Sequence, residues 1–203
     1  MDRLNIGIDV DGCVADFSGT YIKLANSMFD LALRPEDQTG WAHQSLGLTD
    51  AQDNAVWDRI NNTPNWWTRL PKLPNTDTLT EWAKAHRVFF LTKRNPTTVG
   101  LSMEDQTANW LRREFFIPNP TVIITEHKGD VARALRLHCF IDDKFENCWD
   151  VVKGSPNTYS FLHDAPYNKE IEASLWMRRA QHINDFFSQI KGASNGSNYQ
   201  LAA

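Results

Sequence analysis

Short apolar runs of strand-like character recur along this chain, and most of them are separated by segments with helical spacing. We expect strands over residues 4–10, 88–91, 122–124, 139–141 and 158–162. We expect helices over residues 14–33, 78–85, 103–114, 129–135 and 169–190. Strands that alternate with helices pair in parallel through right-handed crossovers, with helices on both faces of the sheet. The sequence therefore predicts an α/β fold with a Rossmann-like parallel sheet.

Residues 37–67 differ in character from the rest of the chain. They are polar, suggest only short helical pieces, and contain Trp41, Trp57, Trp66 and Trp67. We interpret them as part of a small helical cap inserted after the first strand. The predicted organisation is a core domain of residues 1–17 and 74–191, a cap of residues 18–73 and a flexible tail of residues 192–203.

Composition restricts the partners and the compartment. With 203 residues, 41% hydrophobic residues and a net charge of −4, the chain suits a globular protein and not a nucleic acid binder. Cys13, Cys139 and Cys148 lack metal-ligand spacing and are expected to be reduced thiols. No apolar run is long enough to cross a membrane, and the first strand begins too early to leave room for a signal peptide. We expect a cytoplasmic protein with no membrane partner, and the sequence is compatible with a homodimer.

Polar side chains gather where the expected strands end. They occur, in chain order, in Asp9-Val10-Asp11-Gly12, at Thr92, at Lys128 and in Asp142-Asp143. Ligands of such folds collect beyond the carboxyl ends of the parallel strands. We therefore expect these side chains to share one site.

The carboxylates at this rim indicate a divalent cation. Asp9, Asp11, Asp142 and Asp143 would repel one another, and a site with only oxygen ligands favours Mg²⁺ over zinc. The cation also lets a carboxylate approach a phosphate dianion. Asp9 can then attack phosphorus and form an aspartyl-phosphate, which divides hydrolysis into two easier steps.

The other residues at the rim fit the same reaction. Asp11 is placed to protonate the leaving oxygen and then to deprotonate the attacking water, a contribution on the order of 10²–10⁴-fold. Thr92 and Lys128 would hold the other phosphoryl oxygens. Gly12 permits the turn that brings backbone amides near the phosphate.

Each of these pieces also has an ordinary structural explanation. Asp-x-Asp-Gly is a common turn, paired aspartates can cap a helix, and a single threonine or lysine is usually structural or solvated. Their occurrence in order, at the ends of successive strands, favours the catalytic interpretation.

Four segments resemble the motifs of the haloacid dehalogenase superfamily of phosphohydrolases, namely Asp9-Val10-Asp11-Gly12, Leu91-Thr92, Lys128 and Ile141-Asp142-Asp143. The resemblance extends to about residue 190. Within that superfamily the chain is more similar to the 5'(3')-deoxyribonucleotidases and their bacterial and phage relatives. The segments that carry this similarity are residues 11–17, 65–74, 141–144 and 163–168.

The resemblance implies roles for individual residues. Asp9 would be the nucleophile and Asp11 the acid/base. Mg²⁺ would be bound by Asp9, by the backbone carbonyl of Asp11 and by Asp143, with Asp142 as an orienting neighbour. The implied substrate is a nucleoside 5'- or 3'-monophosphate, with a pyrimidine deoxynucleotide as the leading candidate.

The resemblance also assigns aromatic residues to the substrate base. Phe17 matches a phenylalanine that packs on the base, and Trp41 and Trp57 fall where the family places further aromatic residues. Their alternative role is to form a small hydrophobic core within the cap.

The chain departs from the family pattern after Thr92. The family has a small residue and then proline, whereas this chain continues with Lys93-Arg94-Asn95-Pro96. Lys93 is assigned to phosphate binding with solvation as its alternative, and Arg94 is expected to face solvent.

Other functions use parts of the same pattern. One alternative is a phosphatase for another small metabolite, such as a sugar phosphate. A second is removal of phosphate from nucleic acid ends, against which the net negative charge argues. A third is a catalytically inactive binding protein, against which the presence of Asp9, Asp11, Lys128 and Asp143 argues.

Overall fold

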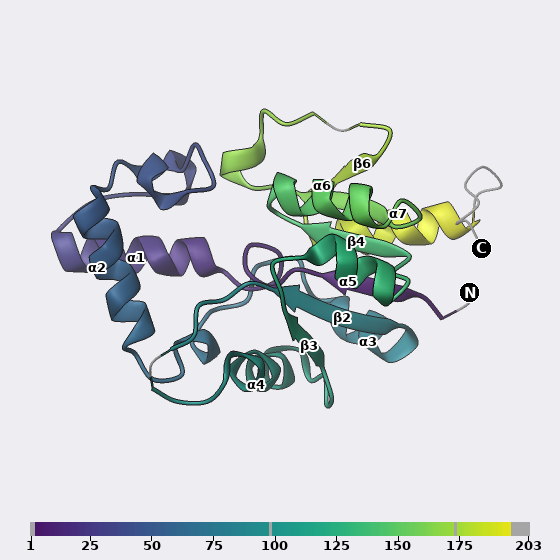
Figure 1. The fold of residues 1–203 in the computed structure, drawn as a ribbon, viewed down its shortest axis with the longest axis horizontal. Helices are drawn as coiled ribbons and strands as arrows, with labels where there is room; N and C mark the ends of the chain where they lie inside the picture. Colours follow the sequence, from purple (N-terminus) through teal and green to yellow (C-terminus); the bar gives the residue numbers. More distant parts are fainter. Residues whose placement is uncertain (1–2, 98, 173, 196–203) are drawn as a thin grey trace.

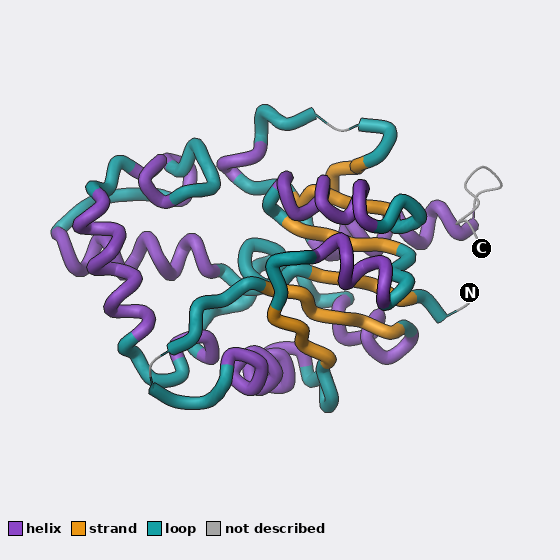
Figure 2. Tube along the Cα trace, in the orientation of Figure 1, coloured by secondary structure: helices purple, strands orange, loops and turns teal. Residues whose placement is uncertain are grey.

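A six-stranded parallel sheet forms the centre of the computed structural model, which describes residues 3–97, 99–172 and 174–195 (Figures 1 and 2). The strands lie in the order β3-β2-β1-β4-β5-β6, and every neighbouring pair is parallel. The strands are β1 (Asn5–Ile8), β2 (Arg87–Thr92), β3 (Thr121–Ile124), β4 (Cys139–Asp142), β5 (Tyr159–His163) and β6 (Met177–Ala180). This arrangement confirms the predicted α/β fold with a Rossmann-like sheet.

Helices cover both faces of the sheet, as Figure 1 shows. The helices are α1 (Phe17–Phe29), α2 (Asp50–Asn61), α3 (Leu79–Ala85), α4 (Met103–Phe115), α5 (Lys128–Ala134), α6 (Phe145–Gly154) and α7 (Ile183–Asn195). The 3₁₀ helices are η1 (Pro35–Asp37), η2 (His43–Leu46), η3 (Trp66–Thr68) and η4 (Pro166–Asn168). Helices α3, α4 and α7 contribute to the core on one face, and α5 and α6 to the core on the other.

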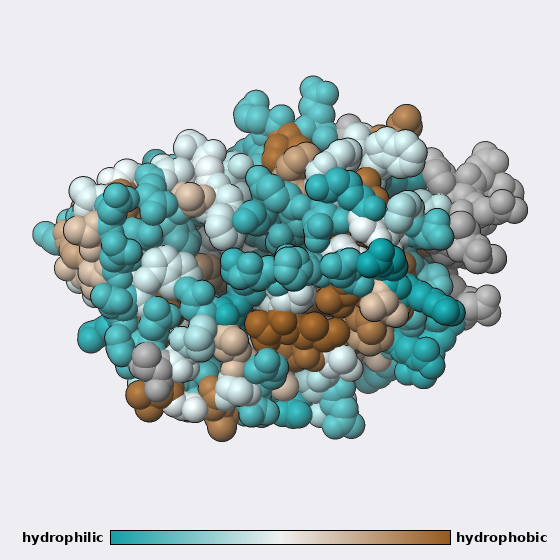
Figure 3. All heavy atoms as spheres, in the orientation of Figure 1, coloured by the Kyte–Doolittle hydropathy of each residue, from teal (hydrophilic) through white to brown (hydrophobic). Residues whose placement is uncertain are grey.

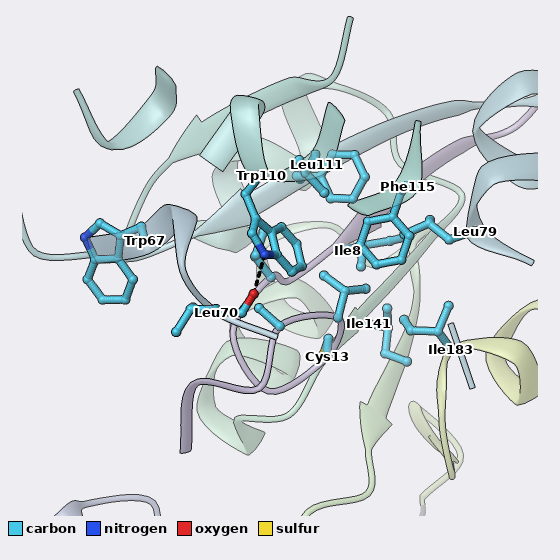
Figure 4. Close-up of a cluster of buried hydrophobic side chains, with 14 of the residues drawn as sticks. Ile8, Cys13, Trp67, Leu70, Leu79, Trp110, Leu111, Phe115, Ile141 and Ile183 are labelled. Atoms are coloured by element: carbon cyan, nitrogen blue, oxygen red, sulfur yellow. Dashed lines mark hydrogen bonds between the residues drawn. The ribbon is translucent and has the colours of Figure 1, made fainter. Parts of the chain in front are cut away.

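Alternation along the strands separates these two cores. Phe90 of β2 belongs to the larger core together with Trp110 of α4, whereas Leu91 belongs to the smaller core with Ala132 of α5. Successive side chains of a strand point to opposite faces, so a strand covered on both sides is apolar throughout. Figure 4 shows the larger core around Trp110, whose indole N–H donates to the backbone carbonyl of Leu70 at 2.7 Å.

Helices α1 and α2, with η1 and η2, form a group that extends away from the sheet (Figure 1). Helix α1 begins after Asp16, whose carboxylate accepts a hydrogen bond from the amide of Gly19 at 2.9 Å and so caps the helix. The chain enters and leaves this group along adjacent paths, because the amide of Asp16 donates to the carbonyl of Pro71 at 2.9 Å. The division into a core and a cap at residues 18–73 stays a prediction.

The expected helix over residues 169–190 is wrong in its first half. Residues Met177–Ala180 form β6, which pairs in parallel with β5, and α7 begins only at Ile183. Met177 and Ala180 are buried. Arg179 donates to Asp164 at 2.8 Å and to the carbonyl of Ile171 at 2.6 Å, so nearby loops supply the polar partners that let this arginine lie in a strand.

Two further differences concern helices. Helix α6 was not among the predicted helices, although its apolar residues Cys148 and Val151 are fully buried. The expected tail from residue 192 begins inside α7, which continues to Asn195, and residues 196–203 lie outside the described part of the chain.

The surface seen in Figure 3 is largely hydrophilic. One hydrophobic area in that view lies over β2 and β3, below α5, on the edge of the sheet. Among the helices of residues 3–195 that the structure describes, none has the length and apolar character of a membrane span.

The Trp110–Leu70 hydrogen bond gives a test of the larger core. We expect Trp110→Phe to lower the free energy of unfolding by about 1–3 kcal/mol, because it leaves the buried carbonyl of Leu70 without its donor. The measurement is the urea midpoint of unfolding. Trp149→Phe on α6 is the control, since that side chain is 38% exposed, and it should change stability by less than about 0.5 kcal/mol. Equal losses of stability in the two variants would show that the hydrogen bond between Trp110 and Leu70 does not stabilise the larger core.

Candidate active site

A cavity of about 460 Å³ opens beyond the carboxyl ends of the central strands. One side is polar and comes from the strand ends and the residues that follow them, including Asp9, Asp11, Gly12, Thr92, Lys128 and Asp143. The other side is aromatic and includes Phe17, Trp41, His43, Trp57 and Trp67. The structure therefore brings nearly all residues of the predicted site to one cavity, with Asp142 as the exception.

A buried lysine organises the polar side. Lys128, the first residue of α5, is 2% exposed, and its ammonium donates to Asp9 Oδ1 and to Asp142 Oδ2, the latter at 2.5 Å. Asp9 follows β1 and is held there by its own amide, which donates to the carbonyl of Ile141 on β4 at 2.9 Å. Lys128, at the start of α5, thus joins Asp9, which follows β1, to Asp142 at the end of β4.

Asp142 is fully buried and does not line the cavity. Its Oδ1 accepts hydrogen bonds from the amide of Lys144 at 2.9 Å and from Asn147 at 3.1 Å, while its Oδ2 accepts from Lys128. With both oxygens occupied, Asp142 is suited to holding Lys128 in place and not to binding a metal directly.

Asp143 faces the cavity beside the turn at Gly12. The hydroxyl of Tyr167 donates to Asp143 Oδ2, and the side chain of Asn168 donates to the backbone carbonyl of Asp143 at 2.8 Å. Gly12 has φ +83°, and a Cβ atom there would collide with the carboxylate of Asp143. Glycine is required at this position for its backbone conformation and for the space that it leaves.

Burial raises the pKa of the site carboxylates. The pKa of Asp9 is raised well above its ordinary value by desolvation, against the attraction of Lys128 and with added repulsion from Asp142 and Asp143. Desolvation and Asp142 likewise raise the pKa of Asp143 to about 7. For Lys128, burial works to lower the pKa, but Asp142 and Asp9 outweigh it and raise the pKa, so the lysine stays a cation.

The net charge of the site favours the binding of a divalent cation. When Asp9, Asp11, Asp142 and Asp143 are all ionised, Lys128 and the buried Arg94 balance two of the four negative charges and leave two. The carboxylates of Asp9 and Asp143 approach each other and Cys13 closely enough to hold an ion. Burial raises the pKa of the Cys13 thiol well above its usual range, so it stays protonated and the oxygens are the available ligands. This donor set fits Mg²⁺.

Arg94 does not face solvent, contrary to the expectation from the sequence. Its side chain is fully buried, and its guanidinium forms a bidentate ion pair with Asp11, with both nitrogen-oxygen distances at 2.7 Å. A third nitrogen donates to the hydroxyl of Thr107 on α4 at 2.7 Å. The partners of Arg94 are separated from it in the sequence, so neighbouring residues gave no sign of its burial.

Thr92 and Lys93 follow one another but lie in different environments. Thr92 is buried at the end of β2, and its hydroxyl donates to Asp11 Oδ2 at 3.3 Å. Lys93 lies at the rim of the cavity with a side chain that is 58% exposed, and its ammonium pairs with Glu126 at 2.8 Å.

The aromatic side of the cavity is a cluster around Phe17. The ring of Phe17 lies 5.6 Å from the rings of both Trp57 and Trp67, measured between centroids. His43 stacks on Tyr21 with centroids 3.6 Å apart, and burial lowers its pKa to about 4, so it is neutral at physiological pH. A flat, apolar ligand fits against such a surface.

Trp41 stands at the edge of this cluster and is 53% exposed. The ammonium of Lys144, which follows β4, lies 3.7 Å from the centroid of its ring. This contact joins the segment before η2 to the segment that follows β4, and both segments line the cavity.

Several residues of the site were missing from the sequence prediction. Trp67 lines the cavity whereas its neighbour Trp66 does not, a distinction that two adjacent tryptophans cannot reveal. His43 was not among the predicted site residues, but it lines the cavity as well. Tyr167 lies within residues 163–168, one of the segments that carry the family resemblance. This position was the sequence feature that could have identified it as a site residue.

Comparison with known proteins identifies a family and relatives of this chain. Residues 3–192 match the model of the family described as 5' nucleotidase, deoxy (pyrimidine), cytosolic type C protein. The chain is 28% identical over 173 residues to a nucleotidase from Clostridium acetobutylicum, covering 84% of this chain and 85% of that protein. It is 22% identical over 178 residues to a 5'(3')-deoxyribonucleotidase from the same organism, covering 87% and 92% respectively.

Solved structures share the fold. A haloacid dehalogenase-like family protein from Streptococcus pneumoniae superposes with a TM-score of 0.59 at 12% identity, covering 93% of this chain and 98% of that one. A haloacid dehalogenase-like hydrolase from Burkholderia xenovorans gives a TM-score of 0.59 at 12% identity, covering 95% and 98%.

Gly12 and Gly47 form a matched pair for testing the turn. Both have positive φ, but a Cβ at Gly47 meets nothing within 4 Å, whereas one at Gly12 collides with Asp143. We expect Gly12→Ala to lower phosphate release from p-nitrophenyl phosphate by about 100-fold or more, a loss comparable to that of one positioned catalytic group. Gly47→Ala should cost about 1 kcal/mol of stability and leave the rate unchanged. Similar rates in the two variants would show that the space beside Asp143 is not needed.

Proposed function

This chain belongs to the 5' nucleotidase, deoxy (pyrimidine), cytosolic type C family of phosphoric monoester hydrolases, and we propose that it dephosphorylates nucleoside monophosphates through an aspartyl-phosphate formed on Asp9, with the help of Mg²⁺. The observation that carries this proposal is the placement of Asp9. This buried carboxylate borders the cavity, is paired with Lys128, and lies next to Asp143 and the turn at Gly12.

The proposed reaction has two steps. In the first, a carboxylate oxygen of Asp9 attacks phosphorus, and the bond between phosphorus and the leaving oxygen breaks as that oxygen takes a proton from Asp11. In the second, Asp11 accepts a proton from a water molecule, whose oxygen attacks the aspartyl-phosphate and releases Asp9. Lys128 and Thr92 stabilise charge on the phosphoryl oxygens.

Asp9, Asp143 and the backbone carbonyl of Asp11 would hold Mg²⁺. When bound, this cation neutralises charge between the carboxylates and the phosphate. Asp142 contributes by holding Lys128 and not by binding the metal, since both of its oxygens already accept hydrogen bonds. Tyr167 and Asn168 fix the position of Asp143.

The aromatic side of the cavity supports a nucleotide substrate. Phe17, Trp57 and Trp67 present ring surfaces against which a base would pack, and Trp41 borders the entrance. The names of the two Clostridium proteins point to the same class. A nucleoside 5'- or 3'-monophosphate, with a pyrimidine deoxynucleotide as the leading candidate, is the substrate that we propose.

A substrate panel tests this proposal. We expect phosphate release from deoxyribonucleoside monophosphates to exceed that from sugar phosphates by at least about 10-fold in kcat/KM, because only the former fill the aromatic side of the cavity. Asp9→Asn, which keeps the shape of the side chain and removes the nucleophile, should abolish turnover of every substrate. Hydrolysis restricted to sugar phosphates would preserve the mechanism and refute the assignment of the base site. Full activity of Asp9→Asn would refute the mechanism.

The raised pKa of Asp143 predicts how the stabilisation of the protein by Mg²⁺ depends on pH. Without metal, the raised pKa lets the folded chain keep this proton up to about pH 7, whereas the unfolded chain loses it near the ordinary aspartate pKa of 3.8. Unfolding then releases a proton, so the stability of the metal-free protein falls as the pH rises through this window. Because Mg²⁺ binds the ionised carboxylate, the increase in Tm that it causes should grow over the same window.

The measurement is the difference in Tm between MgCl₂ and EDTA, at about pH 5 and at about pH 8. Asp143→Asn should remove most of the Mg²⁺-dependent increase and its pH dependence. An increase of the same size at both pH values in the wild-type protein would contradict the prediction.

A further inference from the structure

Arg94 contacts the proposed acid/base residue without reaching the cavity. Its guanidinium binds both oxygens of Asp11 and the hydroxyl of Thr107, and its side chain is fully buried. Asp11, Thr92, Lys93 and Asn95 line the cavity, but Arg94 does not. Any effect of Arg94 on a substrate must therefore pass through a neighbouring residue.

The ion pair fixes Asp11 in one orientation. A bidentate pair between a guanidinium and a carboxylate aligns the two planar groups, which a single contact would not do. Arg94 is itself anchored, because Thr107 lies in the middle of α4 and its hydroxyl donates back to the carbonyl of Met103 at 2.7 Å. Helix α4 therefore anchors Arg94 through Thr107, and Arg94 in turn holds the carboxylate of Asp11.

The ion pair leaves Asp11 beside the cavity with its carboxylate held in one direction. In the second step of the proposed reaction, the attacking water must give a proton to this carboxylate. A carboxylate that is fixed in direction is suited to that step.

Arg94 is connected to the aromatic side as well. Its guanidinium carbon lies 4.8 Å from the ring centroid of Trp67. The indole N–H of Trp67 donates to the carbonyl of Asn95 at 3.0 Å, which fixes the ring against the segment that carries Arg94. One buried side chain thus contacts both the acid/base residue and a wall of the cavity.

We propose that Arg94 is a positioning residue that holds Asp11 as the proton acceptor for hydrolysis of the aspartyl-phosphate. This proposal rests on the proposed function, in which Asp9 forms that intermediate. In the step concerned, water gives one proton to Asp11, its oxygen forms a bond to phosphorus, and the bond between phosphorus and Asp9 breaks with its electron pair returning to the carboxylate. Arg94 gives up no proton and forms no bond to the substrate.

The substrate p-nitrophenyl phosphate isolates this step, because its leaving group departs without a proton from the enzyme. For this substrate kcat/KM reports formation of the aspartyl-phosphate, and kcat reports its hydrolysis once that step becomes limiting. We expect Arg94→Gln to lower kcat by about 100-fold, the lower range for a positioned proton acceptor. We expect kcat/KM to stay within about 3-fold of the wild type, so that KM falls together with kcat.

The intermediate itself provides a second readout. Arg94→Gln should release a burst of p-nitrophenol close to the enzyme concentration, and acid-quenched protein should carry one phosphate that hydroxylamine removes. Asp11→Asn should accumulate the same intermediate. Thr107→Val removes the anchor of the guanidinium while keeping the shape of the side chain, so it should shift kcat in the same direction by a smaller factor. Arg112→Gln, an exposed arginine on α4, is the control and should leave all constants unchanged.

The outcomes separate the proposal from its alternatives. A slow Arg94→Gln enzyme whose kcat and kcat/KM fall equally, with no phosphoprotein, would make Arg94 a purely structural residue and overturn the proposal. Unchanged kinetics would overturn it as well. If Asp11→Asn and Arg94→Gln both fail to accumulate a phosphoprotein while Asp9→Asn remains active, the aspartyl-phosphate mechanism falls, and the role of Arg94 falls with it. Thr107→Val decides the matter should Arg94→Gln not fold.

Discussion

The buried ammonium of Lys128 is the interaction on which the site depends. It lies between Asp9, which follows β1, and Asp142, the last residue of β4, and it is itself the first residue of α5. Removal of this charge would leave two buried carboxylates next to each other without compensation, which is far more costly than loss of an exposed ion pair. The central strands and the proposed nucleophile are therefore held by the same contact.

The arrangement around Lys128 also explains why the adjacent residues Asp142 and Asp143 lie in different environments. Asp142 is the last residue of β4 and is fully buried, where Lys128 and Asn147 occupy its oxygens. Asp143 lies one residue beyond the strand, faces the cavity and meets Tyr167. Neighbouring residues of an extended chain point in opposite directions, so Asp142 faces the interior and Asp143 faces the cavity.

Much of this molecule could be predicted from its sequence, because the signals concerned are local. Apolar runs gave five of the six strands, and polar residues at their ends gave the position of the cavity. Strand β6 was missed because Met177–Ala180 carries two arginines, and the partners of Arg179, Asp164 and the carbonyl of Ile171, lie outside the strand in the segment between β5 and β6. Arg94 was misjudged for the same reason. A charged residue is buried only where distant parts of the chain supply its partners, and a single sequence does not show which parts meet.

The aromatic residues show a related limit. Phe17, Trp41 and Trp57 were candidates for base contacts, and the structure places all three at the cavity, while Trp67 and His43 join them from positions with no distinguishing pattern. Contacts within this cluster run between η2, η3, α1 and α2, so its membership depends on how short helices pack and not on spacing along any one of them.

The segment that carries α1 and α2 leaves the sheet and returns to it at adjacent positions, which affects how the protein can evolve. The amide of Leu73 donates to the carbonyl of Val14 at 2.8 Å, next to the contact between Asp16 and Pro71. The two ends of the intervening segment are therefore already side by side, whatever its length. The entropic cost of closing a loop rises only slowly with the number of residues in it. The segment between these ends can therefore be lengthened, shortened or exchanged while the strands and Lys128 stay as they are.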